Sequence, residues 1–233
     1  MNKKLNTNYF TKTDLLLNIG TGMSIIGAIF LLFGNMISFY LYALSWVVLP
    51  VGVVLFIIGA SRRSTDKDIE DCIKYKLQSM DLSPFNLGVN ERRIVKGREP
   101  IIVENYEYEN GLHLKISKKG IIFSSKYTKT AIFMLTDALM VITRSVSVVS
   151  DEEKNKKFEI PYSAISEVKI VREEKDIDYV DKKFHTVSEK LVIRYNGGYK
   201  FATPVHVDIN SGDTAKLINK VIAEYKESNP ENN

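Results

Sequence analysis

The chain has 233 residues, a formal net charge of +4 and a single cysteine, so an intrachain disulfide is excluded. Asp14 and five basic residues flank one long uncharged run and account for the whole surplus, so the rest of the chain is neutral. A neutral remainder argues against nucleic-acid binding, which relies on clustered positive charge. The five flanking basic residues are Lys3, Lys4, Lys12, Arg62 and Arg63.

The run from Leu15 to Ser61 contains no charged side chain. One membrane-spanning helix needs about 20 apolar residues, so the run is long enough for two. We expect spans at about 15–33 and 39–60, joined by a tight connection over 34–38, where Gly and Asn tolerate left-handed backbone angles. Residues 1–63 are therefore predicted to form a transmembrane hairpin.

The distribution of charge predicts how this hairpin lies in the membrane. Both outer flanks carry basic residues and the short connection carries none. By the positive-inside rule, both termini face the cytoplasm of a multi-pass cell-membrane protein. Neither span holds an Asp, Glu, Lys, Arg or His, which argues against transport by the hairpin alone.

Small residues recur every four positions in the first span, at Gly20, Ser24 and Ala28. Such a stripe lets two helices approach closely. The functional interpretation is homo-oligomerisation through the first span. The alternative is packing against the second span of the same chain.

After the hairpin, residues 64–83 are predicted to form a juxtamembrane amphipathic helix over about 66–80. Thr65 followed by Asp68 resembles a capping box, and Ser83-Pro84 ends the segment. The helix would pack on the chain's own domain or on a partner helix, and residues 84–99 are a linker. Its apolar stripe consists of Ile69, Ile73, Leu77 and Met80.

From about residue 100 the apolar period changes from helical to two, which predicts a β-rich domain over 100–227. Asn196-Gly197-Gly198 predicts a tight hairpin turn, and residues 212–226 predict an amphipathic C-terminal helix. Residues 228–233 are a polar tail that we expect to be disordered. The expected strands lie at 112–117, 121–123, 131–135, 139–143, 158–160, 168–171, 191–195 and 199–203.

Four segments resemble the bacterial pleckstrin-homology-like and GRAM-like domains: Phe133–Ile142, Phe158–Val168, Leu191–Phe201 and residues 212–226. This resemblance implies an α+β fold in which a bent antiparallel β-barrel is closed by a C-terminal helix. The charged insert 173–188 departs from the family pattern, and it is either a protruding hairpin or a loop.

Motifs for catalysis or cofactors are not found in the sequence. There is no Gly-rich phosphate loop, no Gly-x-Ser-x-Gly elbow and no His-Glu-x-x-His helix. His113, His185 and His206 lie far apart, without a second ligand at metal spacing. Cys72 on an amphipathic helix is expected to be a small packing residue or a surface thiol rather than a nucleophile. We therefore expect no enzyme activity, no cofactor and no metal.

Five lysines near the first strands form a basic cluster that is the candidate contact for anionic lipid or a partner. Each lysine close to a membrane contributes about 1 kcal/mol of binding free energy through its attraction to anionic lipid. Glu104, Glu107 and Glu109 lie just upstream, and the alternative is a solvated strand edge that deters pairing. The cluster consists of Lys115, Lys118, Lys119, Lys126 and Lys129.

These features together predict a membrane-anchored, non-enzymatic binding module. Its cytoplasmic domain would recognise a protein partner in or at the membrane, or an anionic lipid. One alternative is a bacteriocin or phage immunity protein, which the family resemblance permits. Another is an accessory subunit of a transporter or channel complex whose polar pathway lies in a second chain.

Overall fold

A computed structural model divides the chain into two compact units, Met1–Ile69 and Glu70–Asn233. Each unit is described by itself. The described residues are 3–11, 15–61, 64–78, 80, 93–95, 98–117, 120–179, 182–206 and 211–229, without the side chains of Asn35 and Ser211.

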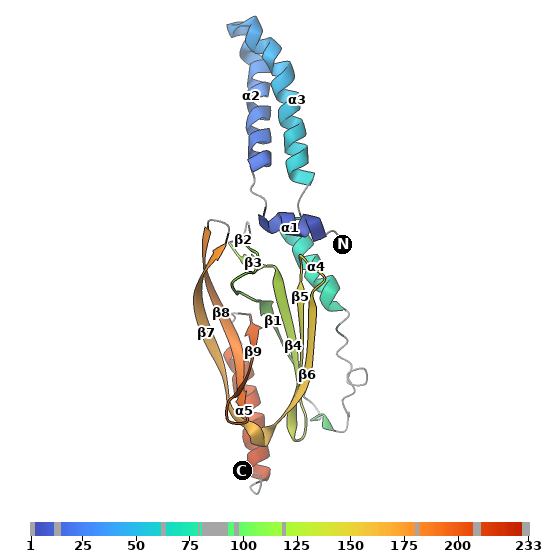
Figure 1. Ribbon diagram of the computed structural model, residues 1–233, viewed down its shortest axis with the longest axis vertical. Helices are drawn as coiled ribbons and strands as arrows, with labels where there is room; N and C mark the ends of the chain where they lie inside the picture. The colour runs from blue at the N-terminus through green and yellow to red at the C-terminus, as the bar shows by residue number, and fades with distance from the viewer. Residues whose placement is uncertain are drawn as a thin grey trace. The chain divides into compact units, whose positions relative to one another are not determined.

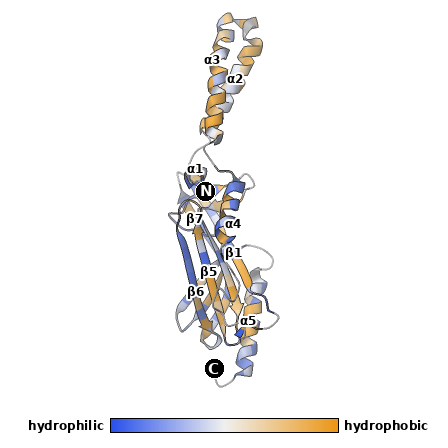
Figure 2. Ribbon diagram, turned by 90° about the vertical axis from the view of Figure 1, so that its right-hand side faces the viewer, coloured by the Kyte–Doolittle hydropathy of each residue, from blue (hydrophilic) through white to orange (hydrophobic). Residues whose placement is uncertain are grey.

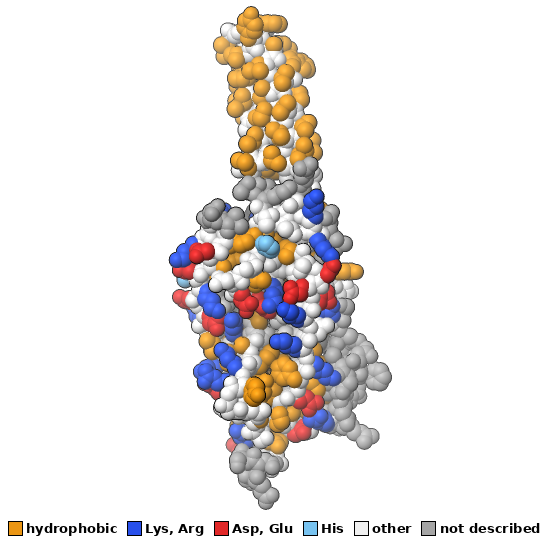
Figure 3. Space-filling model, in the orientation of Figure 1, with side chains coloured by type: hydrophobic (Ala, Val, Ile, Leu, Met, Phe, Trp, Pro, Cys, Tyr) orange, Lys and Arg blue, Asp and Glu red, His pale blue; other side chains and the backbone are white. Residues whose placement is uncertain are grey.

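The first unit contains two long helices, α2 (Leu15–Ile37) and α3 (Phe39–Ser61), which run antiparallel to each other (Figure 1). Both are long and apolar enough to cross a membrane. Their large side chains point outward: Leu32 is 71% exposed and Trp46 is 63% exposed. Figure 2 shows hydrophobic residues along both helices, and Figure 3 shows the resulting apolar surface, which a lipid environment would cover.

Glycines spaced seven residues apart bring α2 and α3 together. Gly20, Gly27 and Gly34 on α2 face backbone atoms of α3, and a Cβ on Gly27 would lie 2.7 Å from the Leu49 nitrogen. Gly59 on α3 faces α2 in the same way, against Leu17. A seven-residue repeat keeps small residues in contact along two helices that cross at a shallow angle. We call this set of contacts the glycine seam.

The small-residue stripe that the sequence indicates overlaps the glycine seam only in part. Gly20 lies in the seam, and Ser24 faces Gly52 of α3. Ala28 is half-buried, and the neighbouring Gly27 makes the close approach instead. The small residues of α2 therefore pack against α3 of the same chain. The glycines that make the closest contacts recur every seven residues rather than every four.

The connection between the two helices is shorter than the sequence analysis expects. Residues 34–37 continue α2 to Ile37, and Ser38 alone separates the helices. The Ser38 carbonyl accepts hydrogen bonds from the backbone nitrogens of Leu41 and Tyr42, and its hydroxyl accepts one from Tyr40. Serine caps the start of a helix well because its side chain satisfies a free N–H. A single capping residue therefore replaces the expected five-residue turn.

A short N-terminal helix, α1 (Lys3–Thr11), contacts the segment that follows α3. The Tyr9 hydroxyl donates to the Asp66 carboxylate at 2.7 Å, and the Ser64 hydroxyl donates to the Asn6 side-chain oxygen at 2.5 Å. These contacts fix the start of the next helix, α4 (Asp66–Gln78), against α1 within the first unit.

The start of α4 is the predicted capping box. The Asp68 carboxylate accepts hydrogen bonds from the Thr65 nitrogen at 2.7 Å and from the Thr65 hydroxyl at 2.8 Å. The Asp68 nitrogen donates to the Thr65 hydroxyl oxygen at 3.2 Å. The Thr65 donors hold the pKa of Asp68 below its ordinary value. The predicted helix 66–80 corresponds to α4, with Met80 beyond its end.

The second unit is built from antiparallel strands and a C-terminal helix, α5 (Ser211–Ser228), so the chain is α+β. Within the described residues the three sheets are not closed into a barrel. The sheets are β1-β4-β5-β6, β2-β3 and β7-β8-β9. Their strands are β1 (Ile101–Tyr106), β2 (Leu114–Ile116), β3 (Ile122–Ser124), β4 (Lys126–Met134), β5 (Ala138–Ser147), β6 (Glu153–Pro161), β7 (Ile165–Tyr179), β8 (Lys182–Tyr195) and β9 (Tyr199–Val205).

The main core lies between the four-stranded sheet, the β7–β9 sheet and α5. Ile132, Leu139, Leu191 and Ile218 are completely buried there. On α5 the buried face includes Ala215, whereas Leu217, which the periodicity places on the apolar face, is 42% exposed. The Asn219 amide donates to the Val168 carbonyl at 2.9 Å and fixes α5 on β7.

Two hairpin predictions have clear outcomes in this unit. At the β8–β9 turn, Asn196 has φ 47° and Gly197 has φ 68°, as the Asn-Gly-Gly sequence predicts. The charged insert 173–188 is a hairpin rather than a loop: it forms the ends of β7 and β8, which stay in register up to Tyr179 opposite Lys182. It does not protrude freely, because Ile177 and Phe184 are buried against Leu114 of β2. β1 was not predicted, because its sequence IIVENY lacks a strict alternation of apolar and polar residues.

Candidate functional site

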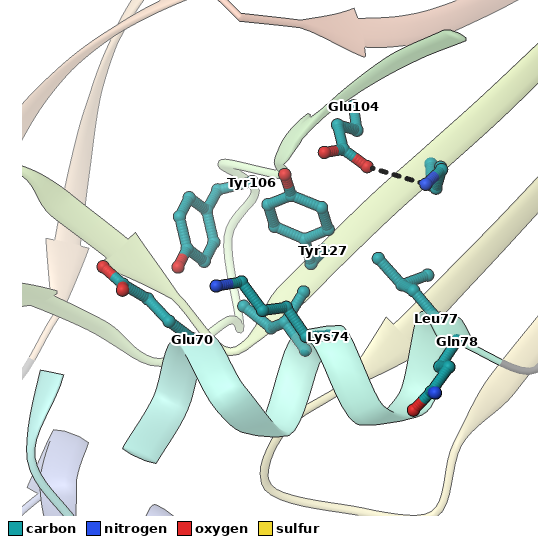
Figure 4. A pocket seen from close by; sticks show the side chains of 9 residues that line it. Glu70, Lys74, Leu77, Gln78, Glu104, Tyr106 and Tyr127 are labelled. Carbon is teal, nitrogen blue, oxygen red and sulfur yellow. Dashed lines mark ion pairs between the residues drawn. The ribbon is translucent and has the colours of Figure 1, made fainter. Parts of the chain in front are cut away.

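A groove of about 510 Å³ lies between α4 and the outer face of the four-stranded sheet in the second unit (Figure 4). We call it the α4 groove. Its walls come from α4, β1 and β4. It is lined by Glu70, Ile73, Lys74, Leu77, Gln78, Glu104, Tyr106, Tyr127 and Lys129.

The sheet supplies two directly opposed residue pairs to this groove. In the antiparallel β1–β4 ladder, Glu104 lies opposite Lys129 and Tyr106 lies opposite Tyr127. Because alternate residues of a strand point to the same face, all four side chains lie on one side of the sheet. Lys129 Nζ lies 3.5 Å from the Glu104 carboxylate, and the two tyrosine rings meet edge to face at 4.9 Å.

The helix supplies an apolar floor and a polar rim. Ile73 and Leu77 are buried, whereas Glu70, Lys74 and Gln78 are exposed. Figure 4 shows the Lys74 amine pointing towards the tyrosine rings. Among the described residues neither Glu70 nor Lys74 forms an ion pair, so both charged groups can turn towards a ligand without breaking one.

A buried lysine holds α4 against the sheet. Lys76 Nζ donates to the Ser147 carbonyl at 2.6 Å and to the Ser150 carbonyl at 2.7 Å, at the turn between β5 and β6. Cys72 is also buried on this face of the helix, in agreement with a packing role. The sequence analysis missed Lys76, although its spacing of four from Cys72 places it on the buried face.

The α4 groove combines a protonated phenol with charged groups of both signs. Burial and the nearby Glu104 carboxylate raise the pKa of Tyr127, which keeps the phenol protonated as a hydrogen-bond donor. The groove's two carboxylates, Glu70 and Glu104, are balanced by the ammonium groups of Lys74 and Lys129.

The basic cluster predicted from the sequence does not form one patch among the described residues. Lys126 and Lys129 are three positions apart on β4 and so point to opposite faces of the sheet. Lys126 Nζ lies 2.5 Å from Glu107, and Lys129 pairs with Glu104 in the α4 groove. Lys115 is half-buried on β2. Lys118 and Lys119 lie outside the described residues, and contact of this cluster with lipid stays a prediction.

The residues predicted to set membrane topology are described only in part. Lys3 and Lys4 are exposed on α1. Lys12, Arg62 and Arg63 lie outside the described residues. The predicted linker 84–99 is described at 93–95 and from Arg98 onward, where an isolated bridge pairs Ile94 with Leu135.

The histidines show no metal-site geometry in the part of the chain that the structure describes. His113 Nδ1 lies 2.7 Å from the Tyr179 hydroxyl, and burial lowers the pKa of His113. His185 contacts Asp176 at 2.9 Å on the exposed end of the β7–β8 hairpin. No group of three His, Cys, Asp or Glu side chains there could hold a metal ion. In comparisons with known proteins, no family model, curated protein or solved structure matches the chain.

Proposed function

We propose that this chain is a two-span membrane anchor that presents a non-enzymatic binding module to a partner protein in or at the membrane. One observation carries the proposal. α4 begins five residues after the apolar helix α3 ends, and from Glu70 onward it forms one wall of the α4 groove. The element that follows the anchor in the chain therefore also forms one wall of the α4 groove.

The chemistry of the α4 groove favours a segment of a protein as the ligand. Tyrosine is enriched among the residues that contribute most to protein interfaces, and Tyr106 and Tyr127 stand side by side here. The apolar floor of Ile73 and Leu77 would accept an apolar side chain of the partner. Because anchor and partner share one membrane plane, a weak contact gains effective concentration and suffices for specific assembly.

The α+β unit is best interpreted as a pleckstrin-homology-like domain. Antiparallel sheets whose core is covered by a single C-terminal helix support this interpretation, as does the Asn-Gly-Gly hairpin before that helix. β1 and β9 do not pair as strands, but the Asn105 side-chain amide donates to the Val205 carbonyl at 2.8 Å and joins the two sheets at this side.

The topology we propose places both termini in the cytoplasm. The uncharged connection around Ser38 and the basic flanks, including Lys3 and Lys4, support it through the positive-inside rule. A cysteine placed at exposed Glu227, in a Cys72→Ala background, should react with a membrane-impermeant maleimide only after cells are permeabilised. Labelling of intact cells would contradict this topology.

Site-specific photo-crosslinking tests the binding function. A photoreactive phenylalanine at Gln78, on the rim of the α4 groove, should crosslink to one partner in intact membranes. The matched control is the same group at Lys200, an exposed residue of β9 outside the groove. Tyr127→Ala should abolish the adduct at Gln78. Equal adducts at both positions, or an adduct that survives Tyr127→Ala, would exclude the α4 groove as the binding site.

A further inference from the structure

The β2–β3 hairpin of the second unit exposes two large apolar side chains, one on each side of its turn. Ile116 ends β2 and is 56% exposed, and Ile121 precedes β3 and is 51% exposed. The Ser117 nitrogen donates to the Ile121 carbonyl at 2.8 Å, and the Ile121 nitrogen donates to the Ser117 hydroxyl at 3.0 Å. The two isoleucines are thus held at the end of a closed hairpin.

The base of this hairpin is packed firmly into the second unit. Leu114 of β2 is 1% exposed and packs with Ile177 and Phe184 of the β7–β8 hairpin. Phe123 of β3 is buried, and its ring lies 5.2 Å from that of Tyr106. The base of the hairpin is therefore anchored in the unit, while Ile116 and Ile121 are exposed to an outside surface.

The hairpin lies at the end of the unit where the chain enters from the apolar helices. Glu70 follows Ser61, the last residue of α3, by nine residues, which limits their separation to about 30 Å. Glu70 and Tyr106 line the same groove, and Tyr106 contacts β3 through Phe123. Within the second unit, Figure 1 shows β2 and β3 at the same end as α4 and far from the end where β8 turns into β9.

We propose that Ile116 and Ile121 insert into the boundary between headgroups and acyl chains of an anionic leaflet. The inference rests on the two-span anchoring proposed above and names an additional contact of the same domain. Apolar side chains at such a boundary reach about 5–10 Å into the lipid, a depth that side chains at the end of a hairpin can reach. Lys115, next to Ile116, supplies positive charge at headgroup level.

The sequence between the two isoleucines favours an anionic lipid surface as the partner. In the sequence the two residues before Gly120 are Lys118 and Lys119, so the residues between the isoleucines carry positive charge and no acidic group. Lys126 and Lys129 of the basic cluster lie on β4, where they pair with Glu107 and Glu104. We therefore place the proposed lipid contact at the hairpin rather than at Lys126 and Lys129.

Fluorescence of the full chain in lipid nanodiscs tests the insertion. In a Cys72→Ala background, Ile121→Cys carries a polarity-sensitive nitrobenzoxadiazole label, and the discs contain phosphatidylglycerol. The expected result is a blue-shifted emission that doxyl-labelled lipid quenches, with less quenching when Ile116→Asn is added. The matched control is the same label at Tyr199→Cys, which is 68% exposed at the β8–β9 turn and should show neither effect. Thermal melting in detergent shows whether each variant is folded.

The outcomes separate this inference from the proposed anchoring. Emission at position 121 equal to that at position 199 would overturn the insertion. A blue shift without quenching by doxyl lipid would also overturn it, because the label would then face protein. Release of the unmodified chain from membranes by alkaline carbonate would overturn the two-span anchor itself and the insertion with it. Retention in carbonate together with a water-exposed label would overturn the insertion alone.

Discussion

Gly52 of α3 lies so close to Ser24 of α2 that a Cβ on Gly52 would come within 2.5 Å of the Ser24 backbone nitrogen. The contact involves main-chain atoms, which cannot turn aside as a flexible side chain can. Ser24 also donates its hydroxyl to the Gly20 carbonyl at 2.8 Å, so its polar group is satisfied inside the hairpin. The contact between α2 and α3 therefore depends on the absence of a side chain at a few positions.

Gly52→Val should weaken the packing of the two helices. The added side chain has no space against the α2 backbone, and overpacking of this kind costs about 1–3 kcal/mol. The matched control is Gly22→Val, because nothing lies within 4 Å of a Cβ at Gly22. Thermal unfolding of the full chain in detergent should show a lower Tm for Gly52→Val and little change for Gly22→Val. Equal Tm values for the two variants would contradict the glycine seam.

Lys76→Met should loosen α4 from the β5–β6 turn. The methionine keeps the apolar stem but leaves the carbonyls of Ser147 and Ser150 without their donor, which costs about 1–3 kcal/mol. Hydrogen exchange should become faster in residues 147–152 and in α4 from Glu70 onward. Lys74→Met is the control: Lys74 is exposed on the same helix, and its replacement should leave exchange unchanged. Unchanged exchange in both variants would show that Lys76 does not fix the helix.

Protonation of Glu173 should make the second unit less stable in acid. Ion pairs with Lys175 and Lys190, both at 2.9 Å, lower the pKa of Glu173 from 4.5 to about 2. Since the pKa is lower in the folded state, the stabilisation is complete above about pH 4.5 and is lost as the pH falls towards 2. Partial exposure screens the pairs, so we expect a contribution of about 1 kcal/mol.

A comparison of unfolding curves for wild type and Glu173→Gln checks this pH dependence. The difference in free energy of unfolding should be constant at neutral pH and should shrink between about pH 4.5 and 2. Glu174→Gln serves as the control, because Glu174 pairs with Arg172 at 3.3 Å on a surface where both side chains are more than half exposed. A difference between wild type and Glu173→Gln that persists unchanged to pH 2 would disprove the assignment.

Thr130→Val should weaken the contact between the two larger sheets. The buried Thr130 hydroxyl lies 3.0 Å from that of Thr143 and 2.7 Å from that of Thr203, which belongs to the β7–β9 sheet. Valine has the same shape but leaves two buried hydroxyls with one partner fewer, at a cost of about 1–3 kcal/mol. Urea unfolding should shift to lower concentration. Thr136→Val, at an exposed turn, should not shift it, and a shift of equal size there would reject the explanation.

Local patterns in the sequence were sufficient to predict the elements whose structure depends on neighbouring residues. The apolar run predicted two long helices, Thr65 with Asp68 predicted the start of α4, and Asn196-Gly197-Gly198 predicted the last hairpin turn. Each of these features depends on residues at most a few positions apart, or on composition over one element. That is why no knowledge of tertiary contacts was required.

Contacts between distant segments were decided only by the tertiary structure. Nothing in the sequence around Lys76 indicates that its ammonium group donates hydrogen bonds to two carbonyls about seventy residues away. The α4 groove also needs the β1–β4 register, which brings Tyr106 beside Tyr127. The lysines of the basic cluster are close in sequence, yet Lys126 and Lys129 point to opposite faces because a strand alternates.

The sequence by itself determined the division of this protein into an uncharged pair of helices and a neutral, β-rich remainder. Hydropathy and charge are properties of the residues alone, so they can be read before folding. Only the tertiary structure decided which glycines meet, which lysines are neutralised by glutamates, and that Ile116 and Ile121 stay exposed together. These outcomes depend on the pairing of segments far apart in the chain, and burial and ion pairing exist only once those segments are packed.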